Sequence, residues 1–67
     1  MKPQTWQWVE RQLRDNGGSL ERSSGSHFNW KMPNGALVTV PHHPKVLPIG
    51  TLLSIMRTAG LRGKSDR

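Results

Sequence analysis

The strongest constraint on the fold is a pair of strand-like runs on either side of one tight turn. In residues 27–32, polar and apolar side chains alternate, as they do in a strand with one buried face. The sequence Pro33-Asn34-Gly35 is a strong turn signal, and residues 36–40 form the most β-branched stretch of the chain. We therefore predict an antiparallel hairpin. Its buried face holds Phe28, Trp30 and Met32.

The other face of the first run carries polar side chains only. These are His27, Asn29 and Lys31. If helices cover one face of the sheet, the opposite face stays open and these side chains are accessible to a ligand. A shorter strand is expected before the hairpin, over residues 19–22, with Ser23-Ser24-Gly25 as the turn between them.

A helix is predicted over residues 5–15. Trp6, Val9 and Leu13 form one apolar stripe on it, and Asn16-Gly17-Gly18 supplies residues that end a helix. Trp8 lies off the stripe, either at the edge of the core or in contact with a ligand. Glu10 and Arg14 have the spacing of an i,i+4 ion pair on this helix. The apolar spacing of the other aromatic residues favours a core position over a base-stacking platform.

A second helix is expected to begin near Ile49 or Gly50. Its apolar face has the spacing i, i+3, i+4 and i+7. The residues of this face are Leu52, Ile55, Met56 and Ala59. Gly60 is placed to end the helix in the left-handed conformation, which would fold Leu61 back onto Met56.

These elements predict a single small α+β domain, residues 1–61, in the order α-β-β-β-α. Two helices lie on one face of a three-stranded antiparallel sheet, and residues 62–67 form a flexible basic tail. A chain of 67 residues without cysteine must draw its stability from one compact core, either alone or together with a partner protein.

The charge balance of the chain favours binding to polyanions. Ten Lys and Arg against four Asp and Glu give a net charge of +6, which suits nucleic acid first and acidic proteins second. No run approaches the roughly 20 apolar residues that span a bilayer. The first residues lead into an amphipathic stretch and not into the apolar core of a signal peptide. We therefore expect a cytoplasmic protein without a membrane partner.

Four short motifs, in their order along the chain, resemble one family. Gly25-Ser26-His27, Val38-Thr39-Val40-Pro41-His42, Ile49-Gly50-Thr51-Leu52 and Ala59-Gly60-Leu61 look like the HicA toxins of bacterial HicAB toxin–antitoxin modules. The resemblance runs from the first helix to Leu61. It implies a fold similar to the double-stranded-RNA-binding domain and metal-independent cleavage of mRNA by the histidine of the Gly-Ser-His element. That catalytic histidine is His27 in this chain.

The resemblance also implies a protein partner. HicA toxins are neutralised by HicB antitoxins, which cover the active face of the toxin. A HicB-type antitoxin is therefore expected over the His27 face, and any contact with DNA is expected only indirectly, through the antitoxin.

The expected chemistry needs no cofactor. RNA carries its own nucleophile, the 2′-hydroxyl next to the scissile phosphate, so the enzyme must move protons and hold the phosphate. Histidine suits proton transfer because its ordinary pKa, about 6.5, lies near physiological pH. His27 would then act as base or acid. The residues predicted to bind the RNA are Ser26, Asn29, Lys31 and His42.

Each of these residues also has an ordinary explanation. Asn29 and Lys31 are typical of the solvent face of a strand. Adjacent histidines such as His42 and His43 point in different directions and rarely hold one metal ion, so we expect no metal site. One of the two could be the second proton-transfer group, although a loop position favours a structural role.

Two other functions remain open from the sequence. One is a non-catalytic RNA-binding module with the double-stranded-RNA-binding shape. The other is an inactive toxin retained as a partner of its antitoxin. The RNA-binding module differs from a nuclease at His27: a binder keeps its RNA affinity after the loss of this residue and never cleaves, whereas a nuclease loses cleavage first. The intact Gly-Ser-His element argues against the inactive toxin.

Overall fold

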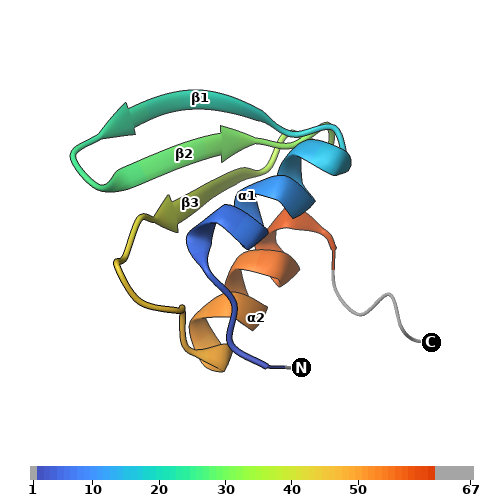
Figure 1. Ribbon diagram of the computed structural model, residues 1–67. Helices are drawn as coiled ribbons and strands as arrows, with labels where there is room; N and C mark the ends of the chain where they lie inside the picture. The colour runs from blue at the N-terminus through green and yellow to red at the C-terminus, as the bar shows by residue number, and fades with distance from the viewer. Residues whose placement is uncertain (1, 62–67) are drawn as a thin grey trace.

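The computed structural model describes residues 2–61, which form two helices and one three-stranded sheet (Figure 1). The elements are α1 (Trp6–Asp15), β1 (Ser19–Ser24), β2 (His27–Lys31), β3 (Leu37–Pro41) and α2 (Ile49–Ala59). The sheet is antiparallel with the strand order β1-β2-β3. The predicted α+β class and the order α-β-β-β-α are confirmed. The predicted tail, residues 62–67, lies outside the described residues.

Helix α1 begins one residue later than predicted, because Thr5 is its N-cap. The hydroxyl oxygen of Thr5 accepts a hydrogen bond of 3.2 Å from the backbone N–H of Trp8. Val9 and Leu13 are fully buried, as the stripe predicted. The rings of Trp6 and Trp8 are half-buried and pack against the core, so Trp8 takes the core-edge position.

Helix α2 has the predicted bounds and the predicted C-terminus. Gly60 adopts the left-handed conformation with a φ of 79°, and the backbone N–H of Leu61 donates to the carbonyl oxygen of Met56 at 2.8 Å. This is the hydrogen bond of a Schellman motif. The apolar face of the helix is buried as predicted, at Leu52, Ile55, Met56 and Ala59.

The β2–β3 hairpin confirms the alternation read from the sequence. Gly35 closes the turn with a φ of 89°, and its N–H donates to the carbonyl oxygen of Met32 at 2.8 Å. Trp30 lies opposite Val38 across the hairpin, and both side chains are buried under the helices. Asn29 lies opposite Thr39 on the other face.

Strand β1 departs from the prediction. It extends to Ser24, which pairs with His27, so the predicted turn Ser23-Ser24-Gly25 is wrong. The turn is Gly25-Ser26, and Gly25 has a φ of 60° that suits glycine. The β1 sequence is mostly polar, and its residues are exposed throughout. It therefore has no alternation of polar and apolar side chains from which the end of the strand could be predicted. The register also shifts between Leu20 and Arg22, which makes Glu21 a β-bulge residue.

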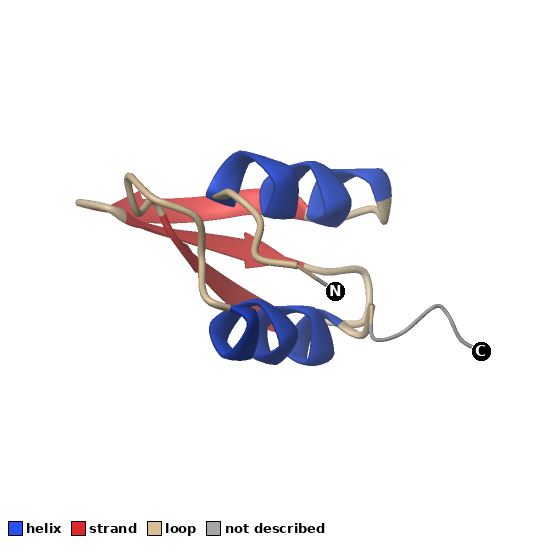
Figure 2. Cartoon of the chain, turned by 60° about the horizontal axis from the view of Figure 1, so that its bottom comes forward, coloured by secondary structure: helices blue, strands red, loops and turns tan. Residues whose placement is uncertain are grey.

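The core lies between the sheet and the two helices, which cover one sheet face (Figures 1 and 2). It is built from α1, β2, β3, α2 and the loop residues Met32 and Leu47. Within the described part of the chain, neither helix has the length and apolar character of a membrane span.

Candidate functional site

The candidate site lies on the sheet face opposite the helices. His27 is the first residue of β2 and follows the Gly25-Ser26 turn directly. Its side chain is exposed, and its neighbours across the sheet are Ser24 on β1 and Pro41 on β3. The predicted orientation is therefore confirmed: a histidine stands on an open sheet face, where a large substrate can reach it.

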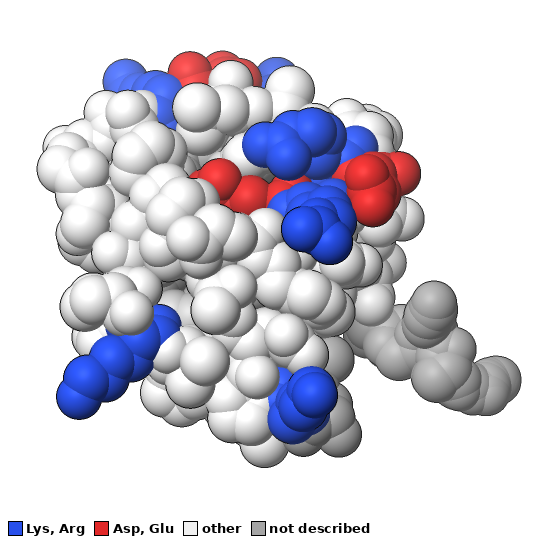
Figure 3. Space-filling model, viewed as in Figure 1, with Lys and Arg blue, Asp and Glu red and all other residues white. Residues whose placement is uncertain are grey.

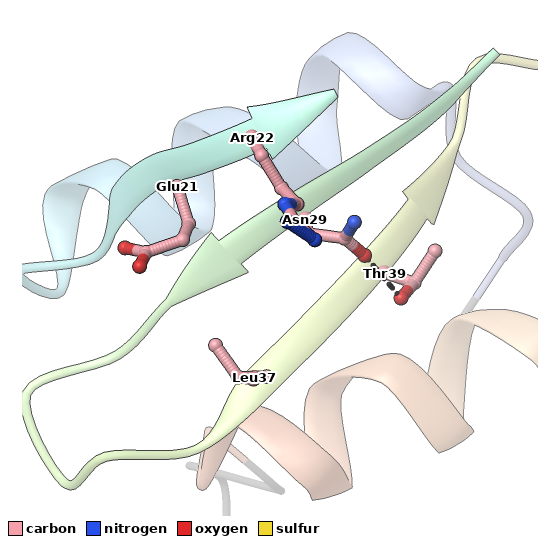
Figure 4. A pocket seen from close by; sticks show the side chains of 5 residues that line it. All are labelled: Glu21, Arg22, Asn29, Leu37 and Thr39. Carbon is pink, nitrogen blue, oxygen red and sulfur yellow. Dashed lines mark hydrogen bonds between the residues drawn. The ribbon is translucent and has the colours of Figure 1, made fainter. Parts of the chain in front are cut away.

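Asn29 occupies the middle of the same face. It pairs with Arg22 on β1 and with Thr39 on β3, so the three side chains form a row across the sheet. The hydroxyl of Thr39 donates a hydrogen bond of 2.6 Å to the side-chain oxygen of Asn29 (Figure 4). This bond fixes the amide and leaves its NH₂ group for a ligand.

A shallow, open pocket of about 460 Å³ surrounds this row. Glu21 and Leu37 complete its lining together with the three residues of the row (Figure 4). Leu37 is 62% exposed and lies opposite Lys31, the third predicted site residue on β2. The pocket therefore combines donors, an acceptor and an apolar wall on the face that carries His27.

His42 lies on the helix side of the sheet. Its ring is stacked between Trp6 and Phe28, with ring centroids 3.6 Å from each. Its Nε2 atom lies 2.7 Å from a carboxylate oxygen of Glu10. Both ring faces and one ring nitrogen thus have partners inside the protein. The predicted RNA contact of His42 stays a prediction, and these contacts favour the structural role that the sequence left open.

The backbone of His42 nevertheless reaches the site. Its N–H donates a hydrogen bond of 2.8 Å to the carbonyl oxygen of Ser26, the residue before His27. The structure places the predicted residues His27, Asn29 and Lys31 along β2, with Ser26 in the turn before it, and His42 joins them only through this main-chain bond. His43 is exposed, and its Nδ1 accepts a hydrogen bond of 3.4 Å from the backbone N–H of Lys45.

Glu10 is the partner of the His42 ring and was not among the site residues predicted from the sequence. It is only 8% exposed, and one of its oxygens lies 2.7 Å from His42 Nε2 and accepts a bond of 3.0 Å from the indole N–H of Trp30. The predicted Glu10–Arg14 ion pair does not form among the described residues, because the carboxylate turns inward. Arg14 instead lies over the Trp30 ring, 5.2 Å from its centroid.

A sequence signal for Glu10 did exist. The apolar stripe of α1 runs through positions 6, 9 and 13, and position 10 is the i+4 member of the same stripe. An acid at that position is placed toward the core and needs a buried partner. Arg22 and Glu21 were missed for another reason: the bulge that places them beside the pocket leaves no mark on the sequence pattern.

On the face of the molecule shown in Figure 3, the positive charge is not gathered in one place. In the view of Figure 3, Lys and Arg side chains form separate groups and not one continuous patch. The charge on this face therefore does not by itself define where a polyanion binds.

A comparison with protein families finds one match that covers most of the chain. The family is described as the HicA toxin of bacterial toxin-antitoxin, and its model matches residues 6–61. This range begins with the first residue of α1 and ends with the residue that closes α2. No curated protein sequence matches the chain.

Proposed function

The chain belongs to the HicA family, the toxins of bacterial toxin–antitoxin systems, and from this premise we propose that it is a metal-independent endoribonuclease that cleaves mRNA with His27. One observation carries the proposal. The histidine of the Gly-Ser-His element stands exposed at the start of β2, on the sheet face that no helix covers. A polymer can lie across such a face, whereas it could not reach a histidine under the helices.

The proposed reaction is an internal transfer within the RNA. The 2′-oxygen attacks the adjacent phosphorus as its proton leaves, and the bond from phosphorus to the 5′-oxygen breaks as that oxygen gains a proton. The products are a 2′,3′-cyclic phosphate and a 5′-hydroxyl. His27 moves one of these two protons, a contribution typically worth about 10²–10⁴ in rate.

The neighbours of His27 are proposed to hold the substrate. Lys31 lies on the same face of β2 and places a positive charge near the RNA backbone. Asn29 offers its NH₂ group to a base or a ribose, because Thr39 already occupies its oxygen. The hydroxyl of Ser26, in the exposed turn, is positioned beside the start of β2 for a contact with the sugar or the phosphate.

Incubation of the purified protein with RNA in excess EDTA tests the proposal. We expect cleavage to persist and the new ends to be 2′,3′-cyclic phosphates, since no metal takes part. His27→Ala should abolish cleavage. Gln7→Ala, at an exposed position on α1, is the control and should cleave like the parent protein. His43→Ala asks separately whether the exposed histidine of the loop is the second proton-transfer group.

The outcome also decides between the competing functions. RNA binding without cleavage by the parent protein would identify a non-catalytic binding module. Neither binding nor cleavage, with antitoxin binding intact, would identify an inactive toxin. Full cleavage by His27→Ala would reject the assignment of the catalytic residue.

Because the family consists of the toxins of toxin–antitoxin systems, an antitoxin is the implied protein partner. We propose that a HicB-type antitoxin covers the His27 face, where Leu37 offers an exposed apolar side chain. Antitoxin and RNA should then compete for the His27→Ala protein, and a stable ternary complex of the three would contradict this placement.

A further inference from the structure

The β-bulge in β1 gives the open face a feature that a regular strand cannot provide. In a regular strand, consecutive side chains point to opposite faces. Because the register shifts between Leu20 and Arg22, Glu21 and Arg22 both line the same pocket (Figure 4). Bulges are frequent beside functional sites, where they redirect a side chain. The bulge thus sets an acidic and a basic side chain next to each other.

The pocket presents a defined set of hydrogen-bonding groups. Arg22 offers only donors, and Glu21 as a carboxylate offers only acceptors. Asn29 offers mainly its NH₂ group, because its oxygen accepts the hydroxyl of Thr39 at 2.6 Å. Leu37, which is 62% exposed, adds an apolar surface beside these groups. A ligand that satisfies all of them has acceptors and donors along its edge and an apolar face.

This combination of groups suits a nucleobase better than a phosphate. A phosphate would gain from Arg22 but would be repelled by the carboxylate of Glu21 in the same pocket. A base is neutral, and its ring face can lie against Leu37.

We infer that this pocket binds a guanine base of the RNA, next to the scissile phosphate. The inference rests on the proposed function, since it assumes that the substrate lies across the His27 face. Arg22 and the Asn29 amide donate to the acceptors of the base, and Glu21 accepts from its N1–H and N2–H groups.

Guanine is the base that uses the whole set. It alone carries two adjacent N–H groups on its pairing edge, which match the two oxygens of a carboxylate, and its O6 and N7 suit an arginine. Adenine is usually read by asparagine through one donor and one acceptor. Here the acceptor of Asn29 is engaged by Thr39.

The position of the pocket fits a nucleotide beside the reaction centre. Asn29 follows His27 by two residues on β2, and at about 3.3 Å per residue their Cα atoms lie about 7 Å apart. Side chains at positions i and i+2 of a strand share a face. A nucleotide bound at Asn29 therefore has its neighbouring phosphate within reach of His27.

Short oligoribonucleotides that differ at one base provide the test. We would measure their affinity for the His27→Ala protein, which leaves the RNA intact. Each oligonucleotide carries guanosine, inosine, adenosine, cytidine or uridine at one position in an otherwise constant sequence. Inosine lacks only the 2-amino group of guanosine. We expect guanosine to bind about tenfold more tightly than inosine and than the other bases.

The variants assign this preference to the pocket. Glu21→Gln, in the His27→Ala background, should remove most of the difference between guanosine and inosine. Asp15→Asn deletes the same charge at an exposed position on α1 and should preserve the difference. Circular dichroism would verify that both proteins are folded.

Failure of this inference is separable from failure of the proposed function. Equal affinity for guanosine and inosine, a preference for another base, an equal effect of Asp15→Asn, or no detectable binding would each overturn the guanine pocket. Cleavage by the parent protein would then still support the nuclease. Conversely, a guanosine preference that Glu21→Gln removes would uphold the pocket even if the parent protein cut no RNA.

Discussion

The backbone N–H of His42 donates a hydrogen bond of 2.8 Å to the carbonyl oxygen of Ser26. This bond ties the loop after β3 to the turn that precedes His27. The His42 ring is in turn held between two aromatic rings and against the buried carboxylate of Glu10. The buried face of α1 is thus coupled to the start of the strand that carries the proposed catalytic residue.

Replacement of Glu10 by alanine should cost much of the stability of the protein. The change leaves the indole N–H of Trp30 and the ring of His42 without their partner, and a buried unsatisfied group costs about 1–3 kcal/mol. We expect a loss of about 2–3 kcal/mol in the free energy of unfolding. Domains of this size have roughly 3–10 kcal/mol in total. Urea unfolding followed by tryptophan fluorescence measures the loss.

Two further variants show whether the partners of Glu10 cause this loss. Glu10→Gln keeps an acceptor for Trp30 and should lose less than Glu10→Ala. Asp15→Ala, at an exposed position of the same helix, should change the free energy of unfolding by no more than about 0.5 kcal/mol. Equal losses for Glu10→Ala and Asp15→Ala would show that the buried network contributes nothing.

Gly18→Ala and Gly50→Ala should act in opposite directions although the chemical change is the same. A Cβ at Gly18 would lie 2.6 Å from Met32 Sδ and 2.9 Å from the carbonyl oxygen of Leu13. Such overpacking costs about 1–3 kcal/mol. A Cβ at Gly50, in the first turn of α2, meets no atom within 4 Å. Alanine there should stabilise by about 0.5–1 kcal/mol. Thermal unfolding of both variants measures the difference, and a stabilising Gly18→Ala would refute the close packing.

The elements with a buried face were predictable from the sequence, whereas strand β1 was not. Burial imposes a period on the side chains, so α1, α2 and the β2–β3 hairpin lie close to their predicted positions. Strand β1 is exposed along its whole length, and no burial pattern marks its end or its bulge. The position of His27 was predictable because alternation assigns it a face. The contacts of His42 were not, since a loop has no period and Glu10 is 32 residues away in sequence.

Gly25→Ala should lower both stability and RNA cleavage, whereas Gly35→Ala should lower stability alone. Both glycines have positive φ angles, 60° and 89°, and a Cβ at either position would meet no atom within 4 Å, so backbone strain is the main cost. That strain is about 1–2 kcal/mol for alanine. Only Gly25 lies in the turn that sets His27, while Gly35 closes the other end of β2. Urea unfolding measures the effect on stability, and the RNA cleavage rate of the folded protein measures the effect on activity. If both variants cleave equally well, the geometry of the Gly25-Ser26 turn does not matter to the reaction.

Lys31 should contribute to RNA binding through one phosphate contact, which is measurable as a change in salt dependence. Lys31 lies on the same face of β2 as His27, whereas Arg11 is exposed on α1 in the other layer. Each phosphate neutralised on a single strand contributes about 0.7 to the slope of log K against log salt. In the His27→Ala background, Lys31→Gln should therefore weaken binding at low salt and reduce the slope by about 0.7. Arg11→Gln removes the same charge and should reduce the slope by less than half as much. Equal effects of the two variants would mean that RNA is attracted by the overall charge of the chain. Lys31 would then make no specific contact with the RNA backbone on the His27 face.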